Sequence, residues 1–259
     1  MFVAEHGPDD GVPIVFLHGS MVAGWMWMGQ VQDLPEFRCL LPDFPGIGHS
    51  GAERWVSLAD TADRVAELVR ARCSDGSAHV VGLSLGGVVG LHLAVRHPEV
   101  VGSLLVSGVP YGTIPWPLRA LSSAMIGLYR RPWGARQIAR MFGIPDDESL
   151  EAFMETARLT DPAALRSVTA EVNLALLPPG LETIAAPTLA VVGAKDTAPA
   201  RRAVPHLQSV IPGAIGRVVP GVGHQWNAED PALFSAMVRQ WVGSGRVDDR
   251  LVPPTAEPA

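Results

Sequence analysis

Six short, almost uninterrupted apolar segments recur along the chain, at residues 12–17, 37–41, 79–83, 100–106, 188–192 and 215–219. Strands buried on both faces of a sheet have this pattern, because neither face needs polar side chains. Helical periodicity fills most of the intervals, at residues 24–34, 57–73, 88–97, 199–211 and 231–242. Strands that alternate with helices predict an α/β fold with a mostly parallel, doubly wound sheet covered on both faces.

The alternation is interrupted between residues 111 and 186, where the sequence has no clear strand. Amphipathic patterns there predict four helices, at residues 116–129, 134–142, 146–159 and 161–176. We therefore predict a helical lid inserted between two core strands. The predicted core consists of residues 1–110 and 187–243, and the predicted lid of residues 111–186. Residues 244–259 contain Gly, Pro and Asp with few apolar side chains, so we expect a disordered tail.

A serine between two glycines stands at one predicted strand-to-helix junction, in Gly82-Leu83-Ser84-Leu85-Gly86. A G-x-S-x-G pattern in this context indicates a nucleophile elbow, whose tight turn holds the serine hydroxyl clear of the sheet. The helix that follows points free N–H groups and a partial positive charge at the same place. Ser84 is therefore the candidate nucleophile.

A serine hydroxyl needs a base to take its proton and an acid to orient that base. Of eight histidines, His224 is the best candidate base, because it lies in a Gly-rich loop between the last strand and the final helix. His18 is expected only to fix a turn by hydrogen bonding. Asp196 follows the strand at 188–192, whereas the loop after 100–106 carries no carboxylate. The order Ser84, Asp196, His224 is that of nucleophile-elbow enzymes.

A tetrahedral oxyanion needs backbone N–H donors aimed at it. One donor follows the nucleophile directly, at Leu85. The other is expected in the loop after the first long strand, at Ser20 with Met21 as the alternative. The backbone of Ser20, rather than its side chain, is expected to matter.

Taken in order, these motifs resemble those of the α/β-hydrolase superfamily, from about residue 2 to residue 242. The matching landmarks besides the elbow are His18-Gly19, Asp43-Phe44-Pro45-Gly46-Ile47-Gly48-His49-Ser50, Gly193-Ala194-Lys195-Asp196 and Gly223-His224. The resemblance implies an α/β-hydrolase fold with a lid and a serine hydrolase or esterase activity. It also implies that Asp43 belongs to a structural turn rather than to the catalytic set. A serine nucleophile argues against haloalkane dehalogenase and epoxide hydrolase chemistry, which uses an aspartate.

Large aromatic and methionine side chains follow the oxyanion loop, populate the lid and stand just past the candidate base. Such side chains suit a hydrophobic substrate. The candidate pocket residues are Met21, Trp25, Trp116, Met125, Tyr129, Trp133 and Trp226. Because most of them also pack lid helices together, we expect only three or four to touch the ligand.

The leading interpretation is a serine hydrolase that cleaves a carboxylic ester or lactone through an acyl-enzyme, with no metal and no organic cofactor. The same triad also serves carbon–carbon bond hydrolysis, amide hydrolysis and acyl transfer. A third interpretation uses these residues as a proton shuttle in a cofactor-independent lyase or oxygenase. The fourth is a non-catalytic ligand receptor, which the intact triad positions disfavour. The fold alone does not choose among the first three interpretations.

Composition narrows the partners and the compartment. The 259-residue chain has a net charge of −6 and no Lys/Arg run, which argues against nucleic acid as a partner. No run of about 18 apolar residues and no signal-like start is present, so we expect a soluble, cytoplasmic protein without a membrane span. The only cysteines, Cys39 and Cys73, are expected to be buried free thiols. The apolar lid would also offer a surface for a homodimer.

Overall fold

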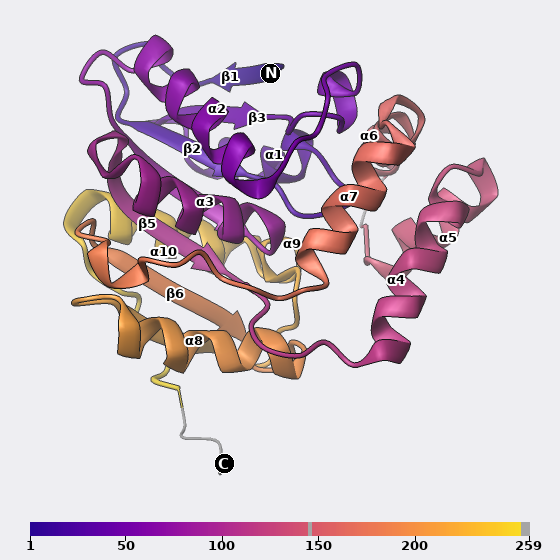
Figure 1. Cartoon of the computed structure of the whole chain (residues 1–259). Helices are drawn as coiled ribbons and strands as arrows, with labels where there is room; N and C mark the ends of the chain where they lie inside the picture. Colours follow the sequence, from indigo (N-terminus) through magenta and orange to yellow (C-terminus); the bar gives the residue numbers. More distant parts are fainter. Residues whose placement is uncertain (145–146, 255–259) are drawn as a thin grey trace.

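A seven-stranded sheet forms the centre of the protein in the computed structural model, which describes residues 1–144 and 147–254 (Figure 1). The strands are β1 (Val3–His6), β2 (Pro13–Leu17), β3 (Arg38–Pro42), β4 (Ala78–Leu83), β5 (Val101–Ser107), β6 (Thr188–Gly193) and β7 (Ile215–Val219). Their order is β1-β3-β2-β4-β5-β6-β7. Edge strand β1 pairs antiparallel with β3, and the other described pairings are parallel. The predicted α/β fold with a mostly parallel sheet is thus confirmed.

Helices cover both faces of the sheet (Figure 1). On one face lie α2 (Leu58–Arg72), α3 (Leu85–Arg96) and α8 (Ala198–Val210), and on the other lie α1 (Met28–Asp33) and α10 (Pro231–Ser244). Successive strand side chains point to opposite faces. Val80 of β4 therefore packs in the core cluster with α2 and α3, whereas Val81 packs in the cluster with α10. Both clusters are apolar, which explains why the strands read as continuous hydrophobic runs.

Short turns follow several strands at their carboxyl ends. The 3-10 turns η1 (Gly24–Trp27) and η2 (Gly48–Ser50) come after β2 and β3. The short helix α9 (Trp226–Glu229) comes after β7 and was not predicted from the sequence. A four-residue helix is too short to show a periodic pattern, which is why the sequence gives no signal for it.

The structure describes four α-helices and one 3-10 turn, η4 (Leu181–Thr183), between β5 and β6. The α-helices are α4 (Trp116–Tyr129), α5 (Pro132–Met141), α6 (Asp147–Leu159) and α7 (Pro162–Val172). These inserted helices stand beyond the end of the sheet toward which the parallel strands point (Figure 1). The helix predicted at 161–176 is shorter than expected, because Ala175 has a φ of 48°, a left-handed conformation that a regular α-helix does not contain. Asp146, the first residue of the helix predicted at 146–159, lies outside the described residues.

The expectation of a disordered tail is wrong for residues 244–254. Val252 forms an antiparallel bridge with Val218 of β7, with N–H···O distances of 2.8 and 2.9 Å. Leu251 is 4% exposed and packs in the core cluster that contains α10. Strand β7 is an edge of the sheet, so its unpaired backbone groups give even a short apolar segment a partner. Residues 255–259, the rest of that predicted tail, lie outside the described residues.

Both cysteines are buried free thiols, as expected. Burial raises the pKa of the Cys39 thiol to about 12, so this thiol stays protonated and unreactive. Within the described residues, no helix is long and apolar enough to cross a membrane.

Acid is expected to destabilise the fold through His92 of α3, because burial lowers the pKa of its imidazole to about 4. In the unfolded chain a histidine titrates near pH ~6.5. As the pH falls from ~6.5 toward 4, the unfolded chain therefore takes up a proton that the folded chain does not, and stability is lost over that interval. Melting temperatures measured by circular dichroism should accordingly drop by several degrees.

The His92→Gln variant provides the control for this prediction. Its melting temperature should fall less steeply than that of the wild type between pH ~6.5 and 4. The neighbouring carboxylate of Asp63 does not interfere, because Arg96 and His97 lower its pKa to about 2. Equal slopes for the two proteins would show that His92 is not a source of the acid sensitivity.

Candidate active site

Ser84 occupies a strained turn between β4 and α3. Its backbone has a φ of 56° and a ψ of −114°, in a region that non-glycine residues rarely adopt. The Ser84 N–H donates to the Ser107 carbonyl at the end of β5, at 2.7 Å. A side chain on Gly86 would collide with the Leu17 carbonyl, so only glycine lets α3 begin this close to β2. This geometry is that of the nucleophile elbow expected from the sequence.

His224 and Asp196 come together from two different loops. Asp196 follows β6 and His224 follows β7. His224 Nδ1 lies 2.8 Å from Asp196 Oδ2, and the other carboxylate oxygen accepts the Thr197 N–H at 2.6 Å. The Asp196 side chain is 1% exposed, whereas the imidazole is 37% exposed. A buried carboxylate therefore holds one ring nitrogen, and the rest of the ring faces partly into solvent.

Gly108 places this pair next to the serine elbow. A Cβ on Gly108 would lie 2.9 Å from His224 Cε1 and 3.2 Å from Asp196 Oδ2, so both side chains pack directly against this residue. The preceding residue, Ser107, is the one whose carbonyl receives the Ser84 amide. The three predicted triad residues thus surround one short segment at the end of β5. In the described part of the chain, no hydrogen bond joins the Ser84 hydroxyl to the His224 imidazole.

One predicted oxyanion donor, Leu85, belongs to the elbow, and the other, Ser20, lies in the loop after β2, the strand that pairs with β4. Leu85 is the first residue of α3, and its N–H has no acceptor among the described residues. The Ser20 N–H is likewise without an acceptor there, and the buried Ser20 Oγ has no partner either. Met21 has a φ of 66°, and its carbonyl accepts a hydrogen bond from the Tyr129 hydroxyl at 2.8 Å. A side chain of the inserted helices therefore holds the loop that carries the Ser20 amide.

His18 has the structural role that the sequence analysis expected. Its Nε2 lies 3.0 Å from the Phe44 amide, which can only donate. Nδ1 must therefore carry the proton and donate to the Gly19 carbonyl, at 2.8 Å. Complete burial lowers the pKa of His18, which keeps the ring neutral and suited to this pair of contacts.

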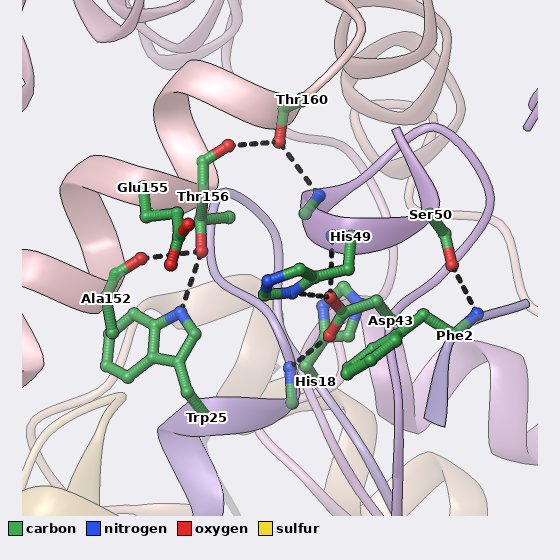
Figure 2. Close-up of polar contacts among 12 residues, drawn as sticks. Phe2, His18, Trp25, Asp43, His49, Ser50, Ala152, Glu155, Thr156 and Thr160 are labelled. Atoms are coloured by element: carbon green, nitrogen blue, oxygen red, sulfur yellow. Dashed lines mark hydrogen bonds and ion pairs between the residues drawn. The ribbon is translucent and has the colours of Figure 1, made fainter. Parts of the chain in front are cut away.

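Asp43 is a second buried carboxylate, and it binds the turns after β2 and β3 to each other (Figure 2). Its Oδ1 accepts the Gly24 N–H at 2.9 Å, and its Oδ2 accepts the His49 N–H at 2.9 Å. Ser50 Oγ accepts the Phe2 N–H at 2.8 Å beside them. These are turn-stabilising contacts, in agreement with the structural role that the resemblance implied for Asp43.

Figure 2 also shows how α6 is attached to the same turns. Thr156 Oγ1 accepts a hydrogen bond from Trp25 Nε1 at 2.9 Å and donates one to the Ala152 carbonyl at 2.8 Å. Directly after the end of α6, Thr160 Oγ1 donates to the Thr156 carbonyl and accepts the Gly48 N–H at 3.2 Å. Thr156 of α6 and the adjoining Thr160 thus hold η1 and η2 directly, so the inserted helices and the turns after β2 and β3 form one network.

The structure places the predicted pocket residues in different environments. Trp25 lines a cavity of about 180 Å³. Tyr129 and Met21 are buried at the loop that carries Ser20, and Met125 is half-buried against the core. The interpretation of Trp226 as a pocket residue is wrong. Its indole is 0% exposed and donates to Ser107 Oγ at 2.8 Å, so it fills the core between β5 and α10.

Trp116 and Trp133 do not line this cavity. Their side chains are 78% and 56% exposed, on the outer surface of α4 and α5. Amphipathic periodicity identifies a helix but does not say which of its apolar residues faces a substrate. Contact of these two side chains with a ligand therefore has no support from the structure.

Sequence reasoning missed the two buried polar residues among those that line the cavity, Gln30 and Asn227. Both are nearly inaccessible, at 1% and 3% exposed. The signal that could have found them is an amide residue within an apolar helical pattern, because a buried amide requires partners. No group of three or more His, Cys, Asp or Glu side chains in the described residues could hold a metal ion.

Comparison with known proteins agrees with this geometry. The sequence model of the alpha/beta hydrolase family matches residues 14–237. This chain therefore belongs to the alpha/beta hydrolase family, as the resemblance of its motifs indicated. An AB hydrolase superfamily protein of Gibberella zeae is 31% identical, over 96% of this chain and 86% of its own.

More specific relatives point to ester hydrolysis. A pimeloyl-[acyl-carrier protein] methyl ester esterase of Edwardsiella ictaluri is 28% identical, over 86% of this chain and 90% of its own. Among solved structures, Est816, described as an N-acyl homoserine lactone degrading enzyme, superposes with a TM-score of 0.75 at 27% identity. That match covers 93% of this chain and 96% of Est816. An ester-hydrolysing enzyme is the class that these relatives support.

Proposed function

We propose that this protein is a serine hydrolase that cleaves a carboxylic ester or lactone of a hydrophobic small molecule through an acyl-enzyme. One observation carries the proposal. Ser84 stands in a left-handed elbow at the N-terminus of α3, and the pair formed by buried Asp196 and partly exposed His224 packs against the end of β5 beside it. Esterases and lactone-degrading enzymes among the similar proteins add support for the class of bond.

In the proposed mechanism, His224 Nε2 removes the Ser84 proton as Oγ attacks the carbonyl carbon of the ester. Asp196 fixes the tautomer with the proton on Nδ1 and stabilises the imidazolium that forms. The imidazolium then gives its proton to the departing alcohol, which leaves an acyl group on Ser84. His224 next takes a proton from water, the resulting hydroxide attacks the acyl carbon, and Ser84 recovers its proton as the acid leaves.

Negative charge on the carbonyl oxygen would be stabilised by the backbone N–H groups of Ser20 and Leu85. Both are free of acceptors in the described residues, so neither has to break a hydrogen bond before it donates. The positive end of the α3 dipole adds to this effect, because Leu85 begins that helix. In this proposal, the inserted helices α4–α7 act as a lid and keep water away from the reaction.

A serine-directed fluorophosphonate, followed by peptide mass mapping, tests the proposal. A stable adduct on Ser84, together with turnover of at least one ester among short, long, aromatic and cyclic esters, is the expected result. An adduct without ester turnover would favour carbon–carbon bond hydrolysis, amide hydrolysis or acyl transfer. No adduct and no ester turnover would contradict the proposal and favour a proton-shuttling enzyme or a receptor.

Tyr129→Phe is expected to lower kcat for ester hydrolysis by about tenfold and to leave KM nearly unchanged. The phenol is buried, and burial raises its pKa, so it remains a donor to the Met21 carbonyl. Without that donor, the loop that carries the Ser20 amide is free to shift. Removal of an oxyanion donor typically costs ~100-fold to ~1,000-fold, and displacement of one should cost less.

Steady-state kinetics separate this positioning role from a loss of stability. Tyr111→Phe, which alters the other tyrosine of the chain, is the matched control and should leave kcat unchanged. Kinetics should be measured well below the melting temperature of both variants. A Tyr129→Phe protein with normal kcat and only a lower melting temperature would reduce Tyr129 to a packing residue.

A further inference from the structure

The backbone just before His224 is held from two sides. On one side lies the loop after β6, which carries the proposed acid, and the Lys195 N–H of this loop donates to the Val222 carbonyl at 2.8 Å. A Cβ on Gly193 would lie 2.1 Å from the Gly223 carbonyl, so the two loops approach this closely only because residue 193 is a glycine. The loop of the acid and the loop of the base therefore pack backbone against backbone.

Glu229 of α9 holds the same backbone from the other side. Its two carboxylate oxygens accept the N–H of Gly223, at 2.9 and 3.2 Å. Within the described part of the chain, the structure gives this N–H no other acceptor. A charged acceptor makes a stronger hydrogen bond than a neutral one. The amide that directly precedes His224 is thus fixed by a single carboxylate.

The short helix that carries Glu229 is itself attached to the core. Trp226, its first residue, is 0% exposed and donates from Nε1 to Ser107 Oγ at 2.8 Å. Gln30 Nε2 donates to the Asn227 carbonyl at 2.8 Å. The Glu229 side chain is exposed, and among the described residues the Gly223 amide is its only hydrogen-bond or ion-pair partner. The carboxylate therefore acts on one target from a fixed position.

We propose that Glu229 is a positioning residue for the proposed base: by holding the Gly223 amide, it keeps the His224 imidazole within hydrogen-bond distance of Asp196. The inference rests on the proposed function, since it assigns a residue that acts through the base of the same triad. The contact with Asp196 is the only hydrogen bond of the imidazole in the described chain, so the ring depends on the backbone that carries it. A displacement of about 1 Å near a reacting group costs up to about a hundredfold in rate.

Steady-state kinetics provide the first test. Glu229→Ala should lower kcat for ester hydrolysis about tenfold and leave KM nearly unchanged, because the base acts in the chemical step. Glu229→Gln keeps an oxygen that accepts the Gly223 N–H, so it should lose less than about threefold. Glu67→Ala is the matched control, at an exposed α2 glutamate with no hydrogen bond or ion pair in the described ranges, and it should leave kcat unchanged. Equal losses in the Ala and Gln variants, or no loss in either, would overturn the proposal.

The tautomer of His224 gives a second readout that needs no turnover. In 15N NMR spectra, the signals of the two ring nitrogens show which of them carries the proton, and they are assigned by their absence from His224→Gln. In the wild type with a neutral ring, the proton should be on Nδ1, because the Asp196 carboxylate only accepts. Glu229→Ala should move part of the protons to Nε2, whereas Glu229→Gln should not.

These spectra separate the two proposals. If Glu229→Ala keeps the proton on Nδ1 as in the wild type, Glu229 does not hold the imidazole, and only the positioning role fails. A wild-type protein with its proton on Nε2 would contradict the pairing of His224 with Asp196, on which both proposals depend. If no ester is turned over and Ser84 is not labelled, the proposed function fails, and the spectra still decide whether Glu229 holds the imidazole.

Combination with Asp196→Asn distinguishes positioning from a general loss of stability. If Glu229 acts through the contact of His224 with Asp196, Glu229→Ala should lower kcat by less than about twofold in a protein that already carries Asp196→Asn. The rates should be measured well below the melting temperature of both proteins. A loss in this background as large as that in the wild type would show that Glu229 acts independently of the pair, and it would overturn the proposal.

Discussion

Ser84→Ala should lower ester turnover at least about a thousandfold and leave the fold intact. The variant removes only the hydroxyl oxygen, and alanine can adopt the φ of 56° at the same cost as serine. The Asp196–His224 pair and the free N–H groups of Ser20 and Leu85 remain in place. What is lost is the covalent step itself. The measurement is kcat/KM on the best ester found in the panel.

Ser209→Ala is the matched control for this loss. Ser209 is exposed on α8, and its hydroxyl donates only to the His206 carbonyl one turn earlier. Its kcat/KM should equal that of the wild type within about twofold. A Ser84→Ala protein that retains more than a few per cent of wild-type turnover would show that Ser84 is not the nucleophile. The proton-shuttle interpretation of the same residues would then take precedence.

Asp196→Asn should reduce kcat by roughly a thousandfold to ten-thousandfold, for a reason visible in its contacts. The carboxylate accepts two hydrogen bonds, one from the Thr197 N–H and one from His224. An amide has one oxygen, and the Thr197 N–H at 2.6 Å retains it. The NH2 group then faces His224 Nδ1, which must accept, so the proton moves to Nε2. In that tautomer, His224 no longer accepts the Ser84 proton.

Asp43→Asn is the informative comparison, since Asp43 is the other buried carboxylate beside a histidine. Its two oxygens each accept a backbone N–H. In the Asn variant, the side-chain NH2 group would face one of these N–H groups, and neither can accept a hydrogen bond. The melting temperature should fall by several degrees, while kcat/KM of the folded protein changes by less than about tenfold. If instead Asp43→Asn abolishes kcat and Asp196→Asn does not, the acid of the triad has been assigned to the wrong residue.

The sequence was sufficient for the architecture because the required signals are local. Most strands of the parallel part of the sheet read as buried apolar runs, and each intervening helix shows its own period. The short helix α9 has no such signal, and the end of α7 depends on a turn at Ala175. The tail shows a different limit. Two apolar residues, Leu251 and Val252, are too few to predict a packed segment from the sequence. They pack in the structure because the edge strand β7 has unpaired backbone groups for this segment to bind.

The candidate triad could also be predicted from the sequence, because parallel strands bring their carboxyl ends to one edge of the sheet. Ser84, Asp196 and His224 each follow such an end, so topology alone predicts that they converge. Pocket residues follow no comparable rule. Trp25 and Trp226 are both tryptophans close to catalytic loops, yet one lines a cavity and the other is completely buried under β5.

The sequence by itself determined the order of strands and helices, the elbow serine and the loops from which its partners come, because periodicity and motif spacing are properties of neighbouring residues. Only the tertiary structure decided which side chains line the cavity, that Tyr129 holds the Met21 carbonyl, and that Asn227 Oδ1 lacks a donor. These facts depend on contacts between residues about a hundred or more positions apart or on a space that several elements enclose together. Such contacts do not produce a periodic pattern in the sequence.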